Sequence, residues 1–94
     1  MSVVTIYVTG YCPYCDMAKR LLDARGVPWT SVDVTTDAAQ RAALLERTGM
    51  RTVPQIFVGD VSVGGFTDLR ALDESGELVP LLEQHGIVHG ASEG

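Results

Sequence analysis

The sequence predicts a single α/β domain. Runs of β-branched and aromatic residues alternate with stretches of helical periodicity, and a two-residue turn, Gly59-Asp60, separates two apolar runs. With 94 residues, of which 46% are apolar and 20% charged, the chain can build one core but not a second domain. We expect the domain to span residues 1–89, and we expect residues 90–94, which are small and polar, to form a flexible tail.

The first half of the chain predicts a strand, a helix and a second strand. Val3–Val8 is nearly continuous in hydrophobicity and rich in β-branched residues, which favours a buried strand. Pro13 opens a helix, because its fixed φ and missing N–H suit the first helical position, and Gly26 ends that helix as a left-handed residue. Val27–Val34 predicts a strand entered through Pro28. A helix between two strands implies a right-handed parallel crossover.

The second half begins with a predicted helix and a hairpin. Asp37 and Gln40 fit a capping box at the start of the helix, and Gly49 ends it. Gln55–Val58 and Val61–Val63 flank the Gly-Asp turn, and a glycine in the first position of a two-residue loop is typical of a type II′ turn. We therefore expect these two segments to pair as antiparallel strands.

Two more helices are predicted after the hairpin. Thr67 or Asp68 caps the first of them, which runs through Leu72. The second covers Glu77–Gln84 and carries Pro80 in its first turn, where a missing N–H is tolerated. We therefore expect the carboxyl-terminal part of the domain to be helical.

The charge pattern argues against nucleic-acid and membrane partners. The formal net charge of −5 repels phosphate backbones, and no run of Lys or Arg offsets it. The longest apolar stretch near the N-terminus, Val3–Val8, contains Thr5 and is too short to cross a bilayer or to act as a secretory signal. We therefore expect a cytoplasmic protein.

The strongest chemical signal is the tetrapeptide Cys12-Pro13-Tyr14-Cys15, at the predicted junction of a strand and a helix. Both cysteines of the chain lie in it, so they cannot link distant segments. The N–H groups of a first helical turn favour a thiolate at Cys12, which lowers the pKa of that thiol and makes it the nucleophile. A disulfide to Cys15 constrains a single turn, which suits reversible exchange. We therefore predict that Cys12 attacks and Cys15 resolves.

Half of a zinc site is an alternative interpretation of the cysteine pair, because His85 and His89 lie near the end of the chain. Nearly the whole sequence separates the two pairs, whereas zinc fingers place roughly 12–15 residues between them. Gly86 also interrupts any helix that would carry both histidines. We therefore predict no metal site.

Two loops are candidate ligand sites, each with a structural alternative. Thr52–Pro54 directly precedes a strand; its proline is either an edge feature or part of a cis bond, which would leave the Val53 backbone free to pair with an extended peptide. Gly64–Asp68 is either a loop with a helix cap or an anion site, with Asp68 near a ligand ammonium group. Arg51 is either solvated or aimed at a ligand carboxylate.

These motifs resemble the glutaredoxin family, and within it the small bacterial-type dithiol members. CPYC at residues 12–15, TVPQIF at 52–57 and GGFTDL at 64–69 occur in the order of that family, and the resemblance runs from Val3 to Gln84. It implies a thioredoxin-like fold, with a four-stranded mixed β-sheet flanked by helices. It also implies a cis bond before Pro54 and a glutathione groove built by the three motifs.

The resemblance further implies a glutathione-dependent thiol-disulfide oxidoreductase. Its Cys12 thiolate would reduce protein disulfides and glutathione mixed disulfides, with Cys15 as the resolving thiol and glutathione as co-substrate; no cofactor would be tightly bound. Disulfide-containing or glutathionylated proteins would be its partners, and the protein would be a monomer. The implied glutathione contacts are Tyr14, Arg51, Thr52, Val53, Pro54, Gly65, Phe66, Thr67 and Asp68.

The chain departs from the family pattern at two positions. Thr9 replaces a lysine that many relatives place three residues before the first cysteine, and Thr67 replaces an acidic residue.

Two other functions stay open. One alternative is an electron donor to ribonucleotide reductase that is itself reduced by thioredoxin reductase; CPYC and TVPQIF favour glutathione instead. The other is a glutathione-ligated iron–sulfur carrier, whose representatives usually have one active cysteine and a glycine in place of Pro13.

Overall fold

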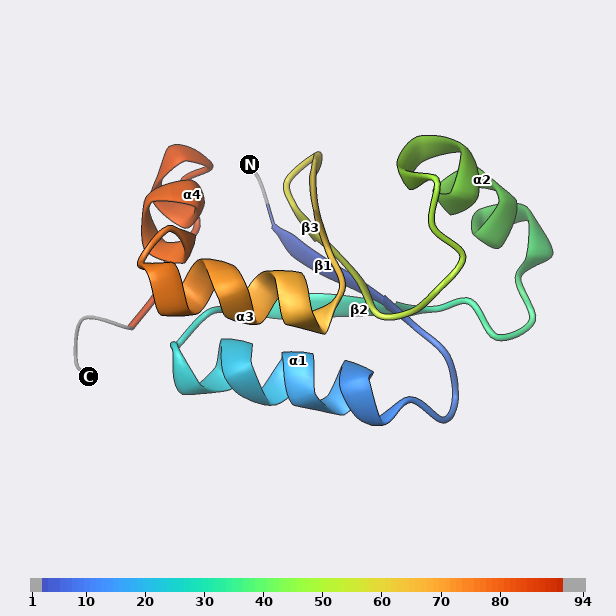
Figure 1. Cartoon of the computed structure of the whole chain (residues 1–94), viewed down its shortest axis with the longest axis horizontal. Coiled ribbons are helices and arrows are strands. Elements are labelled where there is room, and N and C mark those ends of the chain that lie inside the picture. Colours follow the sequence, from blue (N-terminus) through green and yellow to red (C-terminus); the bar gives the residue numbers. More distant parts are fainter. Residues whose placement is uncertain (1–2, 91–94) are drawn as a thin grey trace.

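The computed structural model describes residues 3–90 and contains the predicted sequence of strands and helices (Figure 1). The elements follow one another in this order: β1 (Val4–Val8), α1 (Pro13–Ala24), β2 (Trp29–Asp33), α2 (Ala38–Thr48), β3 (Gln55–Val58), β4 (Val61–Gly64), α3 (Phe66–Ser75) and α4 (Leu78–Gln84). The β1–α1–β2 crossover and the β3–β4 hairpin are both present as expected. Of the predicted tail, residues 91–94 lie outside the described residues.

The four strands form one mixed sheet in the order β2-β1-β3-β4. β1 pairs with β2 in parallel, from Val4 opposite Trp29 to Val8 opposite Asp33, and it pairs with β3 in antiparallel. β3 and β4 are antiparallel neighbours. Because β1 and β2 are parallel, their carboxyl-terminal ends meet at the same edge of the sheet, which is where the chain enters α1.

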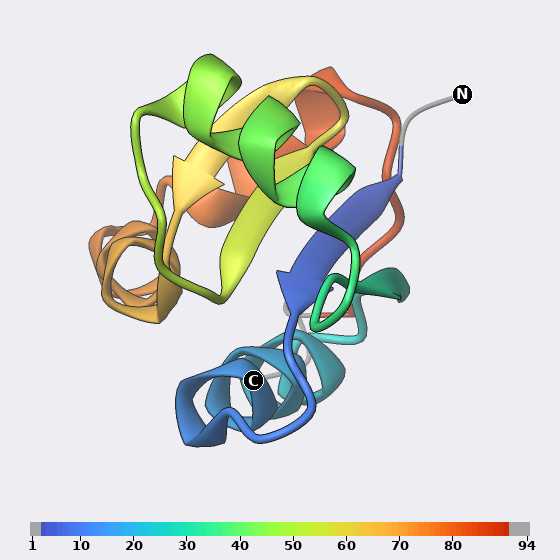
Figure 2. The same ribbon diagram turned by 90° about the vertical axis from the view of Figure 1, so that its right-hand side faces the viewer.

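The helices cover both faces of the sheet. α1 and α3 lie side by side on one face and α2 lies on the other, as the two perpendicular views show (Figures 1 and 2). The side chains of β1 point alternately to the two faces of the sheet, and those of Val4, Ile6 and Val8 are buried against α1 and α3. On the α2 face Tyr7 packs edge-on against Phe57, with ring centroids 5.6 Å apart. The predicted mixed sheet with flanking helices is confirmed.

Most of the predicted helix and turn signals are found where the sequence indicated them. Asp37 is the N-cap of α2 and its Oδ1 accepts a hydrogen bond from the Gln40 backbone N–H at 3.0 Å. Gly26 and Gly49 take the left-handed conformation that ends α1 and α2, with φ of 66° and 73°. Gly59 has a φ of 61°, whereas Asp60 has a negative φ, as a type II′ turn requires.

The prediction for the start of α3 is wrong in its capping residue. Gly65 is the N-cap, in place of Thr67 or Asp68, and the helix continues beyond Leu72 to Ser75. Asp68 instead occupies the third helical position, and its Oδ2 accepts a hydrogen bond from the Gly65 backbone N–H at 2.9 Å. In a capping box, the carboxylate of the third helical residue accepts a hydrogen bond from the backbone N–H of the N-cap residue. The acidic residue therefore lies three positions after the N-cap and does not mark the start of the helix.

The carboxyl-terminal segment packs against the far end of α1. Ile87 is buried in the core, and the Gly90 backbone N–H donates to the Arg25 carbonyl at 2.7 Å. A Cβ atom on Gly26 would come within 2.7 Å of the Gly90 nitrogen, so the two backbones can approach only because residue 26 is glycine. None of the helices in the described region has the length and apolar character needed to cross a membrane.

Candidate active site

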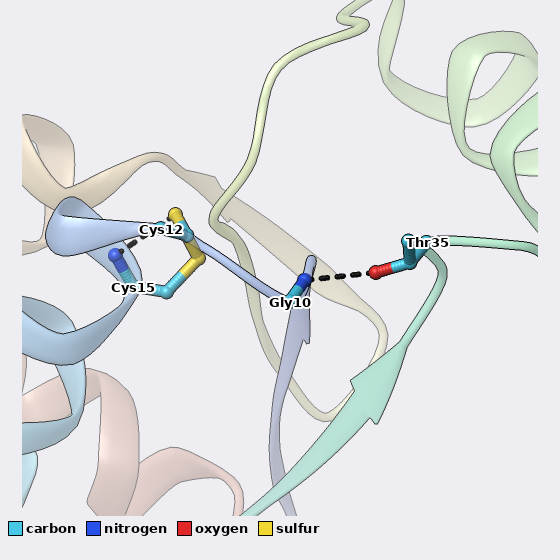
Figure 3. The surroundings of a disulfide bond; sticks show 4 residues. All are labelled: Gly10, Cys12, Cys15 and Thr35. Atoms are coloured by element: carbon cyan, nitrogen blue, oxygen red, sulfur yellow. Dashed lines mark hydrogen bonds between the residues drawn. A yellow bond between two sulfur atoms is a disulfide. The ribbon is translucent and has the colours of Figure 1, made fainter.

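The two cysteines are joined by a disulfide at the amino-terminal end of α1 (Figure 3). Cys12 is the N-cap residue and has an extended backbone, whereas Cys15 lies in the first turn behind Pro13. Their Cα atoms are 5.1 Å apart. The bond therefore links the N-cap and the third helical position of one helix end and connects no separate elements of the fold.

The surroundings of the two sulfur atoms differ. Cys15 is 2% exposed and belongs to the core, whereas Cys12 is partly exposed. The Cys12 sulfur accepts a hydrogen bond from the Cys15 backbone N–H at 3.1 Å. Once the disulfide is reduced, a donor from the first turn and the positive end of the helix dipole favour negative charge at this position. Cys12 is thus the sulfur that a substrate can reach, and it is the one held by the helix end.

A polar contact anchors the loop that precedes Cys12. The Gly10 backbone N–H donates to the Thr35 hydroxyl at 2.8 Å (Figure 3). The Thr35 backbone N–H in turn donates to Asp33 Oδ1 at 2.8 Å. Hydrogen bonds from the Thr35 hydroxyl and backbone N–H hold the pKa of the Asp33 carboxyl below its usual range, and the Lys19 charge acts in the same direction. Sequence patterns did not indicate Thr35, because only strand pairing brings it beside residue 10.

A groove beside the disulfide brings the three sequence motifs together. Its lining is formed by Tyr14, Thr52, Val53, Pro54, Gly65, Phe66 and Thr67. The rings of Tyr14 and Phe66 lie next to each other in this lining, with centroids 6.3 Å apart and an angle of 34° between their planes. Seven of the nine residues that the resemblance assigned to glutathione therefore line one groove.

The bond between Val53 and Pro54 is cis, as the resemblance implied. Within residues 3–90, neither the N–H nor the C=O of Val53 has a hydrogen-bond partner. The Val53 backbone is therefore available to a peptide that lies in the groove.

The other two predicted contacts lie outside the lining of this groove. Asp68 uses one carboxylate oxygen to cap Gly65, and its Cβ and carboxylate occupy the space that a side chain on Gly64 would need. Arg51 lines a neighbouring pocket together with Arg41, Ala42 and Leu45. Arg41 was not indicated by the sequence patterns, since it belongs to α2 and approaches Arg51 only after the chain has folded. This arginine pocket gathers two of the seven cationic side chains of an acidic protein.

The two histidines weighed as zinc ligands have other contacts. His89 Nε2 lies 3.2 Å from Glu83 Oε2, and His85 Nδ1 lies 3.0 Å from the Leu81 carbonyl oxygen. Both follow or end α4, which lies at the opposite end of α1 from the cysteine loop (Figure 1). The cysteines are joined to each other and do not face these histidines.

Comparison with known proteins agrees with this geometry. The family model described as Glutaredoxin matches residues 4–63, which is more than half of the chain. The chain belongs to the glutaredoxin family. This glutaredoxin is 45% identical over 83 residues to Glutaredoxin 3 of Escherichia coli strain K12, an alignment that covers 88% of the chain and 100% of the relative. It is 48% identical over 84 residues to a glutaredoxin of Neisseria meningitidis serogroup A, covering 87% and 98%.

Solved structures of glutaredoxins have the same fold. The crystal structure of a buckwheat glutaredoxin–glutathione complex superposes with a TM-score of 0.85 at 32% identity, covering 93% of this glutaredoxin and 82% of that chain. The solution structure of glutaredoxin from Brucella melitensis gives 0.77 at 45% identity, covering 87% and 89%. The thioredoxin-like fold is therefore confirmed. With its pair of redox cysteines, this glutaredoxin is a thiol-disulfide oxidoreductase.

Proposed function

We propose that this glutaredoxin uses glutathione to reduce protein disulfides and glutathione mixed disulfides. One arrangement carries the proposal: a partly exposed sulfur, held by a helix end, beside a groove in which the Val53 backbone has no internal hydrogen-bond partner. A tripeptide whose own sulfur exchanges with Cys12 fits both features. The complex of the buckwheat relative with glutathione supports the same ligand class.

The thiolate of reduced Cys12 attacks the glutathionyl sulfur of a mixed disulfide. A new disulfide forms between Cys12 and glutathione, and the substrate thiolate leaves and takes up a proton. A second glutathione thiolate then attacks the bound glutathionyl sulfur, which regenerates the Cys12 thiolate and releases glutathione disulfide. Alternatively, Cys15 attacks the Cys12 sulfur and releases glutathione, which yields the disulfide seen here.

The shape and charge of the site suit the parts of glutathione. The cysteinyl part would pair with the Val53 backbone, beside the rings of Tyr14 and Phe66. The carboxylate of the glycine end would lie toward Arg41 and Arg51 in the arginine pocket. Together these groups give an anionic ligand local attraction against the unfavourable net charge of the protein.

The γ-glutamyl end would lie at the start of α3. The backbone N–H groups of Phe66 and Thr67 belong to the first turn of that helix and suit a carboxylate. Asp68 has a second carboxylate oxygen, Oδ1, which has no hydrogen-bond partner within residues 3–90 and suits the ammonium group. The acidic residue can thus cap Gly65 and contact the ligand at once.

The test is turnover of hydroxyethyl disulfide with glutathione, coupled to glutathione reductase, for the wild type, Cys12→Ser and Cys15→Ser. We expect the Cys12→Ser variant to be inactive, because no other thiol is partly exposed at the helix end. We expect the Cys15→Ser variant to retain activity, because a second glutathione can replace the resolving thiol. Equal loss in both variants would contradict this route. Faster coupling to thioredoxin reductase would favour the ribonucleotide reductase alternative.

We further propose that residues 1–89 act as a monomeric cytoplasmic unit. The chain buries its core within one sheet and its helices, so folding of this region requires no second copy. Size-exclusion chromatography with light scattering of the full chain and of residues 1–89 tests the monomeric state and the domain boundary. A dimer or an unfolded shorter chain would contradict the proposal.

A further inference from the structure

Gln55 is the one residue with a polar side chain among the buried residues of the described region, with 2% of its surface exposed. It begins β3 and directly follows the cis Val53–Pro54 bond. Both ends of its amide have partners. Nε2 donates to the Met50 carbonyl at 2.9 Å, and Oε1 accepts from the Thr48 hydroxyl at 3.0 Å.

Thr48 completes a closed set of hydrogen bonds with Gln55 and Met50. The Thr48 hydroxyl accepts from the Met50 backbone N–H at 3.1 Å. Its own proton is shared between Gln55 Oε1 and the Leu44 carbonyl, which lies 2.8 Å away in the preceding helical turn. Both backbone groups of Met50 are therefore held by two side chains that are also bonded to each other. We call Thr48, Met50 and Gln55 the polar cluster.

The polar cluster holds the loop immediately before its ligand-facing part. Within residues 3–90, the backbone groups of Arg51, Thr52 and Val53 make no hydrogen bonds, either with other backbone groups or with side chains. This three-residue segment is thus fixed only at its two ends. Met50 precedes it and is held by the polar cluster, and Pro54 follows it and is bonded to Gln55 along the chain. The segment presents the Val53 backbone to the groove and Arg51 to the arginine pocket.

We propose that Gln55 and Thr48 are positioning residues for glutathione. They lie outside the groove lining, so they act through residues 51–53, whose place between the groove and the arginine pocket they determine. This inference rests on the proposed function, and it assigns the affinity for glutathione to a buried amide and a hydroxyl on the α2 face of the sheet. The chemical reactivity of Cys12, which depends on α1, is set separately.

The proposal predicts a separation of apparent KM from kcat. Gln55→Met and Thr48→Val keep the side-chain size and remove the hydrogen bonds, and each leaves a Met50 backbone group without its partner. We expect the apparent KM for glutathione and for a glutathionylated peptide to rise about tenfold in each variant, the size expected for the loss of roughly one buried hydrogen bond, with kcat within about twofold of the wild type. The pH profile of iodoacetamide alkylation of reduced Cys12 should not change.

Two further variants separate positioning from general destabilisation. Thr48→Ser retains the hydroxyl and should restore the KM of the wild type. Ser75→Ala is the matched control, because it removes a hydroxyl that donates to a helical carbonyl, Leu72, at 3.1 Å, far along α3 from the groove. It should leave both kinetic constants unchanged. The double variant Thr48→Val/Gln55→Met should have an apparent KM about equal to that of the single variant with the higher KM, because the two side chains act as one unit.

Three results would overturn the proposal: an unchanged KM in both Gln55→Met and Thr48→Val, an alkylation rate that falls in parallel with activity, or no rescue by Thr48→Ser. If an apolar variant fails to fold by circular dichroism, Gln55→Asn, whose shorter side chain cannot reach both partners, carries the same expectation. A wild type that turns over without any dependence on glutathione would contradict the proposed function itself. A glutathione-dependent wild type with unaffected variants would contradict only the role of the polar cluster.

Discussion

The hydroxyl of Thr35 accepts a hydrogen bond from the backbone N–H of Gly10 across the carboxyl-terminal edge of the sheet, with the two atoms 2.8 Å apart. Gly10 lies two residues before Cys12, so this bond holds the segment that brings the chain from β1 to the helix end. The parallel pairing of β1 and β2 makes the contact possible, because Val8 and Asp33 are opposite each other where both strands end.

Replacing Thr35 by valine should slow the chemistry of Cys12. The isosteric side chain leaves the Gly10 N–H without its partner, and the loop before the nucleophile gains freedom. We expect turnover and the rate of Cys12 alkylation to fall about fivefold, the size of one net hydrogen bond of about 1 kcal/mol, while KM for glutathione stays constant. Steady-state kinetics and alkylation with iodoacetamide measure the two quantities. Thr35→Ser should behave as the wild type; a valine variant with normal alkylation would refute the role of Thr35.

Asp33 should make a small contribution to stability that disappears in acid. Its pKa is lowered in the folded protein, first by the Thr35 hydroxyl and backbone N–H and then by Lys19. A carboxyl whose pKa is lower in the folded than in the unfolded state stabilises the fold above its unfolded pKa, and that stabilisation is lost as the pH falls through the folded value. The wild type should therefore exceed Asp33→Asn in urea resistance at pH 7 and lose this advantage in the acidic range below about pH 4. If the difference in urea resistance between the wild type and Asp33→Asn did not change with pH, the charge of Asp33 would not be its cause.

The arginine pocket should determine how glutathione affinity depends on salt. Arg41→Gln and Arg51→Gln each remove one cation from the pocket, so we expect KM for glutathione to rise about threefold to tenfold at low ionic strength, as charge-assisted hydrogen bonds are lost. The ratio to the wild type should shrink between 0.05 and 0.5 M salt, because added ions screen exposed charges more strongly over roughly that range.

Arg47→Gln provides the control for this comparison. It makes the same change in net charge on α2, but its guanidinium lies over the Phe57 ring, 4.6 Å from the centroid, and not in the pocket. A control that raises KM as much as the pocket variants would show that net charge, and not position, governs affinity.

The ion pair between Arg25 and Asp73 should support stability without affecting catalysis. Arg25 Nε and Nη2 lie 2.8 and 2.9 Å from the two carboxylate oxygens of Asp73, which joins the end of α1 to α3. Asp73→Asn should lower the midpoint of thermal unfolding by several degrees and leave kcat and KM unchanged, because the pair lies at the end of α1 away from Cys12. Scanning calorimetry together with the hydroxyethyl disulfide assay tests both statements.

A second ion pair serves as the reference for the first. Arg70 and Glu74 are four residues apart on α3, with 60% and 62% of their side chains exposed, so water and salt weaken their attraction. Glu74→Gln should therefore change the unfolding midpoint less than Asp73→Asn does. The reverse order would show that exposure does not decide the strength of these pairs.

The elements that depend on local signals were predictable from the sequence. Pro13 begins α1, Gly49 ends α2 and Gly59 forms the hairpin turn, because each acts through its own backbone conformation. The start of α3 was misassigned for a related reason. An acidic residue near a helix start can be either the N-cap or the third residue of a capping box, and only the structure distinguishes Gly65 from Asp68 as the cap.

The parts of the site that depend on distant residues were not predictable. Thr35 meets Gly10 across 25 positions of sequence, and Arg41 lines a pocket with Arg51 only after α2 has folded back over the sheet. The role proposed for Gln55 could not be predicted either, because a glutamine in the first position of an apolar strand carries no local signature. Motif recognition located the cysteines and the two loops, whereas the side chains that hold those loops came from tertiary structure.

The contact between Gly90 and Arg25 bears on how the molecule can be handled. The last described residue lies at the opposite end of α1 from Cys12, and a helix of 12 residues is about 18 Å long. A fluorescent reporter or an affinity matrix joined directly after Gly90 would therefore start from the side of the protein that faces away from incoming disulfides. Such a fusion should leave the thiol as reachable as it is in the free enzyme.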